Sequence, residues 1–216
     1  MSENETERDR GVNPASAAAD VRAVLAAAGE GEGVIAQCRA LDQWAKQSGR
    51  FLEPTSVLTE ARIGGLEHRV WSDESCGLVR KVTYGGSFGR TVRSVLRGLV
   101  PSTPLEYLDR WTRHNELFGN ITRISGVTEL AGDGLVFVTE QDALYGDFPP
   151  VEAVEDFMRA MGFLAKPQLA FTWYDAARNL AVFDARPGNF ILVEDTAVPF
   201  DVIPVPLNEV SDWPSG

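Results

Sequence analysis

The stretch that most constrains the fold is residues 181–201, AVFDARPGNFILVEDTAVPFD. A short apolar run ends in Asp184, a polar loop follows, and a second apolar run begins directly after Asn189. Residues 194–196 have the composition of a turn, and a third apolar run leads to Asp201. Short apolar runs separated by turn residues predict a β-hairpin here.

The polar residues at the ends of this hairpin are not required by its hydrophobic pattern. Phosphoryl transfer uses such a set: one Asp orients the attacking hydroxyl, and an Asn and a second Asp hold magnesium. The spacing D-x-x-x-x-N from Asp184 to Asn189 matches the catalytic loop of kinases. The alternative is that Asp184, Asn189 and Asp195 are turn formers and that Asp201 caps a strand.

Composition excludes several classes of protein. The chain has 216 residues, 44% of them apolar and 24% charged, which is typical of one globular core. A net charge of -11 argues against binding to nucleic acid, and there is neither an apolar run of membrane length nor a signal pattern. Cys38 and Cys76 are too few for a disulfide framework and lack metal-ligand spacing. We therefore expect a cytoplasmic protein without nucleic-acid or membrane partners.

The N-terminal region carries no recognisable chemistry. Residues 1–14 are polar and charged, and we expect an acidic, disordered tail. Residues 15–50 predict a helical extension of two helices, broken at the glycine-rich residues 29–33. We expect these helices to pack outside the main fold or to dock on a partner.

Residues 56–84 change to strand patterning. Strands are expected at residues 57–63, 67–71 and 78–84, which gives an antiparallel meander. Alternation places Lys81 on the face opposite Arg80. A lysine on a covered face needs an anionic partner such as a phosphate or a helix carboxylate, whereas the alternative leaves Lys81 in solvent and Arg80 inside.

The rest of the chain alternates helices and strands. The sequence STP at residues 102–104 predicts a helix start, and the apolar spacing continues the helix to residue 118. A carboxylate on this helix could pair with Lys81, although most helix acids are solvated. Further elements are expected as strands at residues 121–130 and 135–139, a helix from Pro150 to Gly162, and a hairpin of residues 169–174 and 179–183.

Five motifs in this order resemble one known family. GLEHRV at residues 65–70, VRKVT at 79–83, TPLEYL at 103–108, DARPGNF at 184–190 and DVI at 201–203 are similar to the polyvalent protein kinase domain. That family belongs to the protein-kinase-like and aminoglycoside-phosphotransferase-like superfamily. It occurs in phage and conjugative-element proteins and as small bacterial proteins.

The resemblance covers residues 56–204 and implies an α+β, minimal protein-kinase-like fold. Residues 56–142 would form an N-lobe, in which an antiparallel sheet carries one helix. Residues 143–216 would form a reduced C-lobe with the catalytic and metal-binding loops. The sequence ends at Gly216, soon after Asp201, so we expect no activation segment or peptide-binding helices.

The resemblance also implies roles for single residues. Lys81 would bind phosphates and pair with Glu106, with Asp109 as the alternative partner. Asp184 would be the catalytic acid, and Asn189 and Asp201 would hold magnesium. The implied nucleotide contacts are Gly64, Gly65, Lys81, Glu140, Gln141 and Asp142, the last three through backbone around adenine.

Two functions remain open from the sequence. The first is an ATP- and magnesium-dependent phosphotransferase acting on a protein Ser/Thr or on a small hydroxylated molecule. The second is a non-catalytic nucleotide-binding or interaction module of a phage-related or mobile-element system. The polar residues Lys81, Asp184, Asn189 and Asp201 favour the first, and the short second lobe favours the second. The motif FDV at residues 200–202 departs from the metal-binding motif of the family, because no glycine follows Asp201.

Overall fold

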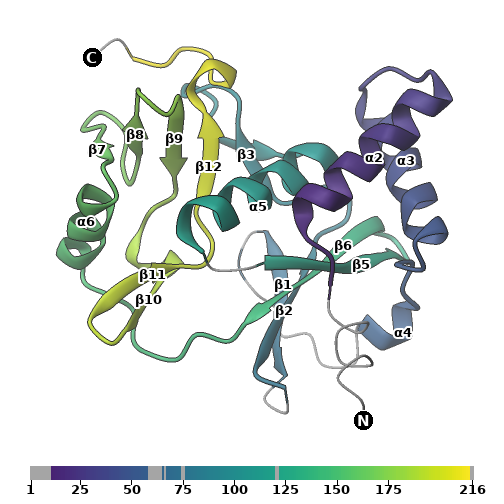
Figure 1. The fold of residues 1–216 in the computed structure, drawn as a ribbon, viewed down its shortest axis with the longest axis horizontal. Coiled ribbons are helices and arrows are strands. Elements are labelled where there is room, and N and C mark those ends of the chain that lie inside the picture. Colours follow the sequence, from purple (N-terminus) through teal and green to yellow (C-terminus); the bar gives the residue numbers. More distant parts are fainter. Residues whose placement is uncertain (1–10, 58–64, 66, 74–75, 120–121, 215–216) are drawn as a thin grey trace. The chain divides into compact units, whose positions relative to one another are not determined.

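The computed structural model consists of helices and antiparallel sheets (Figure 1). The structure describes residues 11–57, 65, 67–73, 76–119 and 122–214. The fold is α+β, as the sequence predicts. Two units can be distinguished. Unit 1 contains Met1–Arg90, Pro101–Thr112 and Ile121–Ala143, and unit 2 contains Thr91–Val100, Arg113–Asn120 and Leu144–Gly216.

Unit 1 is built on a four-stranded antiparallel sheet with the order β1-β2-β6-β5. Its strands are β1 (His68–Asp73), β2 (Leu78–Thr83), β5 (Thr122–Leu130) and β6 (Gly134–Asp142). β5 and β6 are joined by the predicted hairpin turn, where Gly132 and Gly134 both have positive φ. The two strands on either side of β6 are thus β2, which carries Lys81, and β5.

The two faces of this sheet have different neighbours. Val82 is buried in a cluster with Val136 and Val138 on one face. Lys81 and Thr83, the alternate residues of β2, are buried as well. Because successive side chains of a strand point to opposite faces, Lys81 lies on the other face, toward the helices. Of the two alternatives that the sequence left open for Lys81, the structure shows the covered face.

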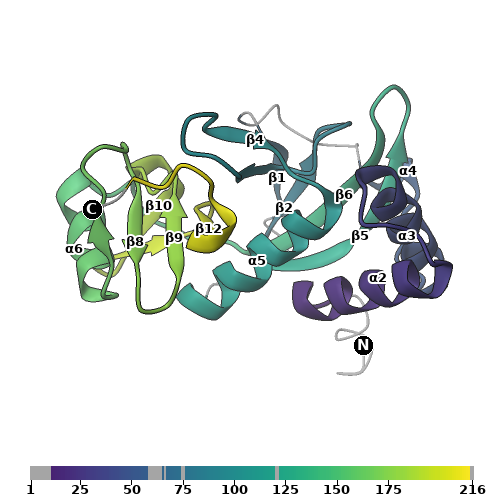
Figure 2. The ribbon, with the colours of Figure 1, turned by 90° about the horizontal axis from the view of Figure 1, so that it is seen from above.

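Three helices contribute to the core on that face: α2 (Pro14–Ala28), α3 (Val34–Gln47) and α5 (Pro104–Phe118). Figure 2 shows α2 and α3 as neighbouring helices, and the Trp44 indole N–H of α3 donates to Asp20 of α2 at 3.3 Å. The shared cluster includes Val21, Leu25, Leu41, Trp44, Leu108, Trp111, Ile124 and Phe137. Of the two expectations for the N-terminal helices, the structure shows packing on the main fold, because their buried residues belong to the same cluster as α5 and β5.

Residues 11–14 are ordered in the structure, in contrast to the expected disordered tail. Val12 pairs with Ile124 of β5 through two backbone hydrogen bonds of 2.9 and 2.8 Å. The Gly11 N–H donates to the Glu140 carboxylate at 2.7 Å, and Pro14 begins α2. A pairing over such a sequence distance leaves no local pattern in the sequence. Residues 1–10 lie outside the described residues.

A second segment, around Phe51, pairs with the edge strand β5 next to Gly126. β5 has a register shift between Ile124 and Gly126, and Phe51 forms a parallel bridge with Val127. A Cβ atom on Gly126 would lie 2.3 Å from the Arg50 carbonyl oxygen, so this close approach requires glycine. The short helix α4 (Pro54–Val57) follows. Val57 is therefore helical instead of opening a strand, and residues 58–63 of that expected strand lie outside the described residues.

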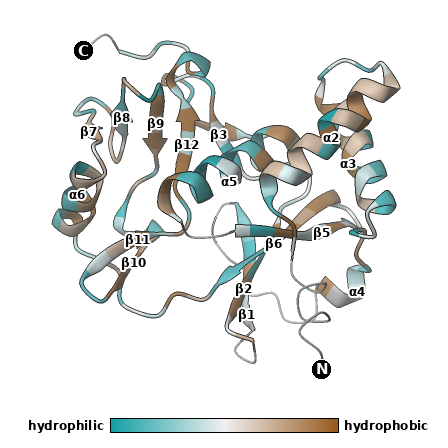
Figure 3. Cartoon of the chain, in the orientation of Figure 1, coloured by the Kyte–Doolittle hydropathy of each residue, from teal (hydrophilic) through white to brown (hydrophobic). Residues whose placement is uncertain are grey.

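Unit 2 contains a four-stranded sheet with the order β12-β9-β8-β7 and the helix α6 (Val151–Ala160). The strands are β7 (Leu164–Ala165), β8 (Trp173–Asp175), β9 (Leu180–Phe183) and β12 (Ile203–Pro206). Figure 3 shows β9 and β12 as strongly hydrophobic, and their side chains form a buried cluster with Val92 and Val210. The strand expected at residues 169–174 begins only at Trp173. A short pair, β3 (Arg90–Val92) and β4 (Leu99–Pro101), was not predicted.

The hairpin at residues 190–199 is confirmed. β10 (Phe190–Val193) pairs with β11 (Thr196–Pro199), and Phe190 faces Pro199. The two-residue turn has φ values of 46° at Glu194 and 66° at Asp195. Positive φ at both positions is the type I′ geometry that matches the twist of the flanking strands.

The longest described helices, α2 and α5, each have 15 residues. Spanning a bilayer takes about 20 predominantly apolar residues. Within the described ranges no helix combines the length and apolar character that a membrane crossing requires.

Candidate functional site

Asp184 lies at the point where β9 ends and the loop toward β10 begins. Its φ of 54° is in the left-handed region, which is uncommon for a residue with a side chain. Asp and Asn tolerate this conformation better than most residues. Such a backbone is held by its surroundings, and strained positions of this kind are frequent at functional sites.

Asn189 holds the loop that begins at Asp184. It is buried at the end of the short 3₁₀ helix Pro187–Asn189, and its side-chain Nδ2 donates to the Asp184 backbone carbonyl at 2.7 Å and to the Asp184 carboxylate at 2.8 Å. The second Asp184 oxygen forms an ion pair with Arg186, whose Nε lies 3.0 Å away. Since Nδ2 serves Asp184, the amide Oδ1 is the atom of Asn189 that remains to bind a cation.

Asp201 reaches the same loop through strand pairing. The N–H of Phe200 donates to the Asn189 carbonyl at 3.0 Å. β12 pairs with β9 so that Ile203 faces the last residue of β9, which directly precedes Asp184. In an antiparallel pair, the residue after one strand end lies opposite the residue before the other strand begins. Asp184, Asn189 and Asp201 are therefore gathered at one end of the β9–β12 pair.

This group within unit 2 consists of oxygen donors. Carboxylate and amide oxygens are the ligands that magnesium takes from proteins. The set of Asn189 Oδ1 and the Asp201 carboxylate fits such an ion, because both groups are hard and a metal that keeps several waters needs only one or two protein ligands. The Asp184 carboxylate is only one fifth exposed and is positioned by Asn189 and Arg186. It can accept a proton from a hydroxyl group placed beside it.

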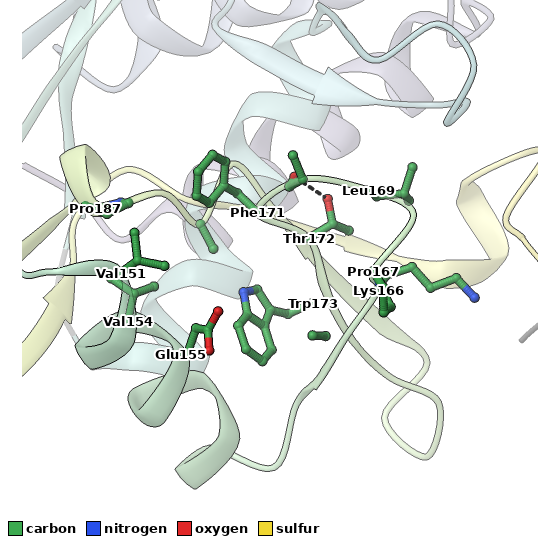
Figure 4. A pocket seen from close by; sticks show the side chains of 13 residues that line it. Val151, Val154, Glu155, Lys166, Pro167, Leu169, Phe171, Thr172, Trp173 and Pro187 are labelled. Atoms are coloured by element: carbon green, nitrogen blue, oxygen red, sulfur yellow. Dashed lines mark hydrogen bonds between the residues drawn. The ribbon is translucent and has the colours of Figure 1, made fainter.

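A cavity of about 250 Å³ in unit 2 borders the same loop through Ala185 and Pro187 (Figure 4). Figure 4 shows the Trp173 ring beside Val154 and Glu155 of α6. The Thr172 hydroxyl donates to the Ala170 carbonyl at 3.1 Å, which is the dashed line of Figure 4. Leu169, Ala170 and Thr172 also line a second cavity, which Asp184 borders.

In unit 1, Lys81 is 3% exposed. Its ammonium lies 5.1 Å from the centre of the Trp111 ring of α5, a cation–π distance. The Arg110 guanidinium lies 5.0 Å from the centre of the same ring and is 2% exposed. Two cationic side chains are thus buried at one aromatic residue, an arrangement that favours an anionic neighbourhood.

Polar residues that sequence reasoning did not select complete this region of unit 1. Arg110 donates to the Glu67 carboxylate at 2.5 Å, and His68 Nε2 lies 3.0 Å from the Tyr107 hydroxyl. Arg110 follows Glu106 by four positions, one helical turn, and this spacing was the only sequence feature that could have indicated it. In unit 2, Arg186 was likewise not selected, although it stands two residues after Asp184.

The two acids considered as partners for Lys81 each make hydrogen bonds that position α5. The Glu106 carboxylate accepts the Thr103 N–H at 2.7 Å, while the Thr103 hydroxyl accepts the Glu106 N–H at 3.3 Å. This reciprocal pair is a capping box at the start of α5. Both oxygens of Asp109 accept from Arg22 of α2, at 2.8 and 2.7 Å. Asp109 therefore ties α2 to α5, and its ion pair is with Arg22.

The residues expected around the nucleotide are distributed as follows. Gly64 lies outside the described residues, and Gly65 is exposed, with its carbonyl accepting from the Tyr84 hydroxyl at 3.2 Å. Glu140 and Gln141 are inside β6, paired with β2 on one side and β5 on the other. Their backbone groups therefore belong to the sheet, in contrast to the expectation that they hold adenine. The strand ends at Asp142.

Comparison of the chain with protein-family models, with curated proteins and with solved structures gave no match. The chemistry of the two residue groups, one in each unit, is therefore what supports a function for this chain.

Proposed function

We propose that the chain is an ATP- and magnesium-dependent phosphotransferase with a protein-kinase-like organisation, which transfers the γ-phosphoryl group to a hydroxyl group. The observation that carries the proposal is the pair of hydrogen bonds from Asn189 to Asp184, with Asp201 at the same end of the β9–β12 pair. A hairpin needs none of these three polar residues, whereas phosphoryl transfer uses all of them.

Asp184 is the residue that we assign to the acceptor hydroxyl. Its carboxylate is one fifth exposed, and its orientation is set by Asn189 on one oxygen and Arg186 on the other. A carboxylate positioned in this way orients the hydroxyl group and accepts its proton as the new oxygen–phosphorus bond forms. Because phosphoryl transfer depends mostly on positioning and charge, a rigidly held acid is well suited to this role.

Asn189 and Asp201 are the residues that we assign to magnesium. The Asn189 Oδ1 and the Asp201 carboxylate would hold the ion, since Nδ2 of Asn189 serves Asp184. When bound, magnesium neutralises the charge that develops on the phosphate oxygens. The contribution of this chain is to hold both oxygen ligands on a loop that strand pairing and the type I′ hairpin make rigid.

Lys81 and Arg110 are the residues of unit 1 that we assign to the nucleotide phosphates. Both are nearly fully buried at Trp111. Lysine and arginine side chains are the groups that proteins use to bind phosphates, and Arg110 also binds the Glu67 carboxylate. Glu106 contributes to this region through the capping box that begins α5, the helix that carries Trp111 and Arg110.

The experiment that tests this proposal measures nucleotide-dependent thermal stability and ATP hydrolysis on the full chain. We expect MgATP to raise the melting temperature of the wild type, and ATP with EDTA to raise it much less. Asp201→Asn should lose this magnesium dependence and Lys81→Met should weaken the shift. Asp195→Asn is the matched control, since Asp195 is an exposed turn residue of the same hairpin with a φ that Asn tolerates.

The outcomes separate the two candidate functions. A shift with MgATP together with hydrolysis that requires Asp184 supports the phosphotransferase. A magnesium-dependent shift without any turnover supports the non-catalytic nucleotide-binding module instead. A folded wild type that neither binds MgATP nor hydrolyses it contradicts both.

A further inference from the structure

Unit 2 contains a cavity of about 280 Å³ that Asp184 borders directly. Most of its wall is apolar and comes from two segments that are far apart in the sequence. Val92, Val95 and Leu99 belong to the β3–β4 region, and Leu169 and Phe183 belong to the sheet side. Phe183 and Val92 are buried in the same hydrophobic cluster, so this wall is part of the folded core.

The polar residues that line the cavity are few. Gln168 and Thr172 line it, and the Thr172 hydroxyl is oriented by its bond to the Ala170 carbonyl. Of the described residues that line the cavity, Asp184 is the charged one. An apolar wall with a small number of polar groups is the usual composition of a small-ligand site, and this volume is at the small end of such sites.

We propose that this cavity is the acceptor site, and that the acceptor is a small alcohol with a largely apolar body that is neutral or positively charged. The proposal rests on the phosphotransferase function proposed above and narrows its acceptor. A carboxylate beside an apolar wall disfavours an anionic acceptor, because none of the described lining residues is cationic and Arg186 pairs with Asp184 from outside this lining. A peptide acceptor needs an extended groove for its backbone, which a cavity of this size does not provide.

The reaction proposed for this site forms one oxygen–phosphorus bond and breaks another. The acceptor oxygen forms a bond to the γ-phosphorus of ATP, and the bond between that phosphorus and the β–γ bridging oxygen breaks. Asp184 accepts the proton of the acceptor hydroxyl and releases it to solvent. The products are a phosphate monoester and ADP. The cavity places the alcohol, and the bonds from Asn189 and Arg186 hold the proton acceptor in position.

The test uses three probes of matched shape and different charge: para-methylbenzyl alcohol, para-(aminomethyl)benzyl alcohol and para-carboxybenzyl alcohol. Binding to the full chain is measured by ligand-observed NMR without nucleotide or magnesium, for wild type, Leu99→Trp and Leu96→Trp. Leu99 begins β4 and lines the cavity, whereas Leu96, in the connection between β3 and β4, is 85% exposed and does not line it. Both variants replace leucine by tryptophan, but only Leu99→Trp places the larger side chain at the cavity. Ala170→Phe, on another wall, is a second blocking variant.

We expect the neutral and cationic alcohols to bind to wild type and to Leu96→Trp, and to bind at least about tenfold more weakly to Leu99→Trp and Ala170→Phe. The carboxylate should bind most weakly to wild type. Absence of binding by all three probes, strongest binding by the carboxylate, or unchanged binding to both blocking variants would overturn the proposal. A second measurement adds MgATP and follows phosphate monoester formation.

That second measurement separates the two proposals. If the alcohols bind in the cavity but the protein neither binds nor hydrolyses MgATP, the phosphotransferase function fails, and the acceptor role fails with it. MgATP hydrolysis with phosphate transferred to protein side chains, unaffected by Leu99→Trp, overturns the acceptor assignment and leaves the phosphotransferase function intact. Transfer of phosphate to the neutral or cationic alcohol supports both proposals if Leu99→Trp abolishes that transfer.

Discussion

Asn189 donates its side-chain amide to both the backbone carbonyl and the carboxylate of Asp184, at 2.7 and 2.8 Å. One side chain therefore fixes the left-handed backbone at Asp184 and the direction of its carboxylate. The same residue accepts the Phe200 N–H through its backbone carbonyl, which places Asp201 beside the loop. Asn189 thus links the two acids of the candidate site, apart from any role in metal binding.

Replacing Asn189 should lower both stability and metal dependence. Asn189→Ala removes two hydrogen bonds from a buried position, so we expect unfolding free energy to fall by about 1–3 kcal/mol. Urea denaturation measures this change, and a magnesium titration of the MgATP thermal shift measures the loss of a ligand. Asn208→Ala is the control, because Asn208 bonds to Asn179 at the exposed surface. Equal, small effects of both substitutions would contradict the structural role of Asn189.

The N-terminal helices should be required for the stability of unit 1. Leu41 of α3 is fully buried in the cluster shared with α5, so Leu41→Ala should cost about 2–5 kcal/mol in urea denaturation. Ile35, on the same helix, is 72% exposed, and Ile35→Ala should change stability by no more than about 0.5 kcal/mol. If Leu41→Ala were as mild as Ile35→Ala, the helices would be a peripheral module, as the sequence alone suggested.

The capping box at the start of α5 should tolerate an amide in place of the acid. Glu106→Gln keeps an acceptor for the Thr103 N–H and should leave the melting temperature nearly unchanged. Glu106→Ala removes that acceptor and should cost about 1 kcal/mol. Thermal unfolding of both variants provides the comparison. A Glu106→Gln variant as unstable as Glu106→Ala would show that the carboxylate charge, instead of the cap, stabilises the helix.

The two cysteines should react with alkylating reagents at different rates. Burial raises the pKa of the Cys38 thiol, whereas Cys76 is exposed. At a given pH below its pKa, a thiol with a raised pKa has a smaller thiolate fraction, so Cys38 should react more slowly and gain reactivity only at higher pH. Mass spectrometry after timed alkylation, with Cys76→Ser as the control, measures both rates. Equal alkylation rates of the two cysteines in the native protein would contradict the packing of α3 against the rest of unit 1.

The elements that the sequence predicts well are those whose cause is local. The hairpin at residues 190–199 follows from its apolar runs and from the turn composition of residues 194–196. The start of α5 follows from Thr103 and Glu106, which form the capping box. The spacing from Asp184 to Asn189 also indicated their proximity, because five residues of loop cannot separate them widely.

The elements that the sequence does not predict depend on distant partners. Val12 is ordered because it pairs with Ile124, and no property of residues 1–14 reveals that partner. The resemblance implied Glu106 as the partner of Lys81 and Asp109 as the alternative, and the hydrogen bonds of Asp109 with Arg22 and of Glu106 with Thr103 could not be read from the sequence. The cavity beside Asp184 is formed by residues 92–99 and 168–172, which no periodicity relates.

The most direct test of the phosphotransferase proposal is transfer of labelled γ-phosphate from MgATP by wild type and by Asp184→Asn. The Asn side chain keeps the shape and tolerates the positive φ at this position, but it does not accept the proton of a hydroxyl group. We predict that the variant stays folded, still binds MgATP, and transfers phosphate at least about a hundredfold more slowly than wild type. Transfer at the wild-type rate by folded Asp184→Asn would contradict the catalytic role of Asp184.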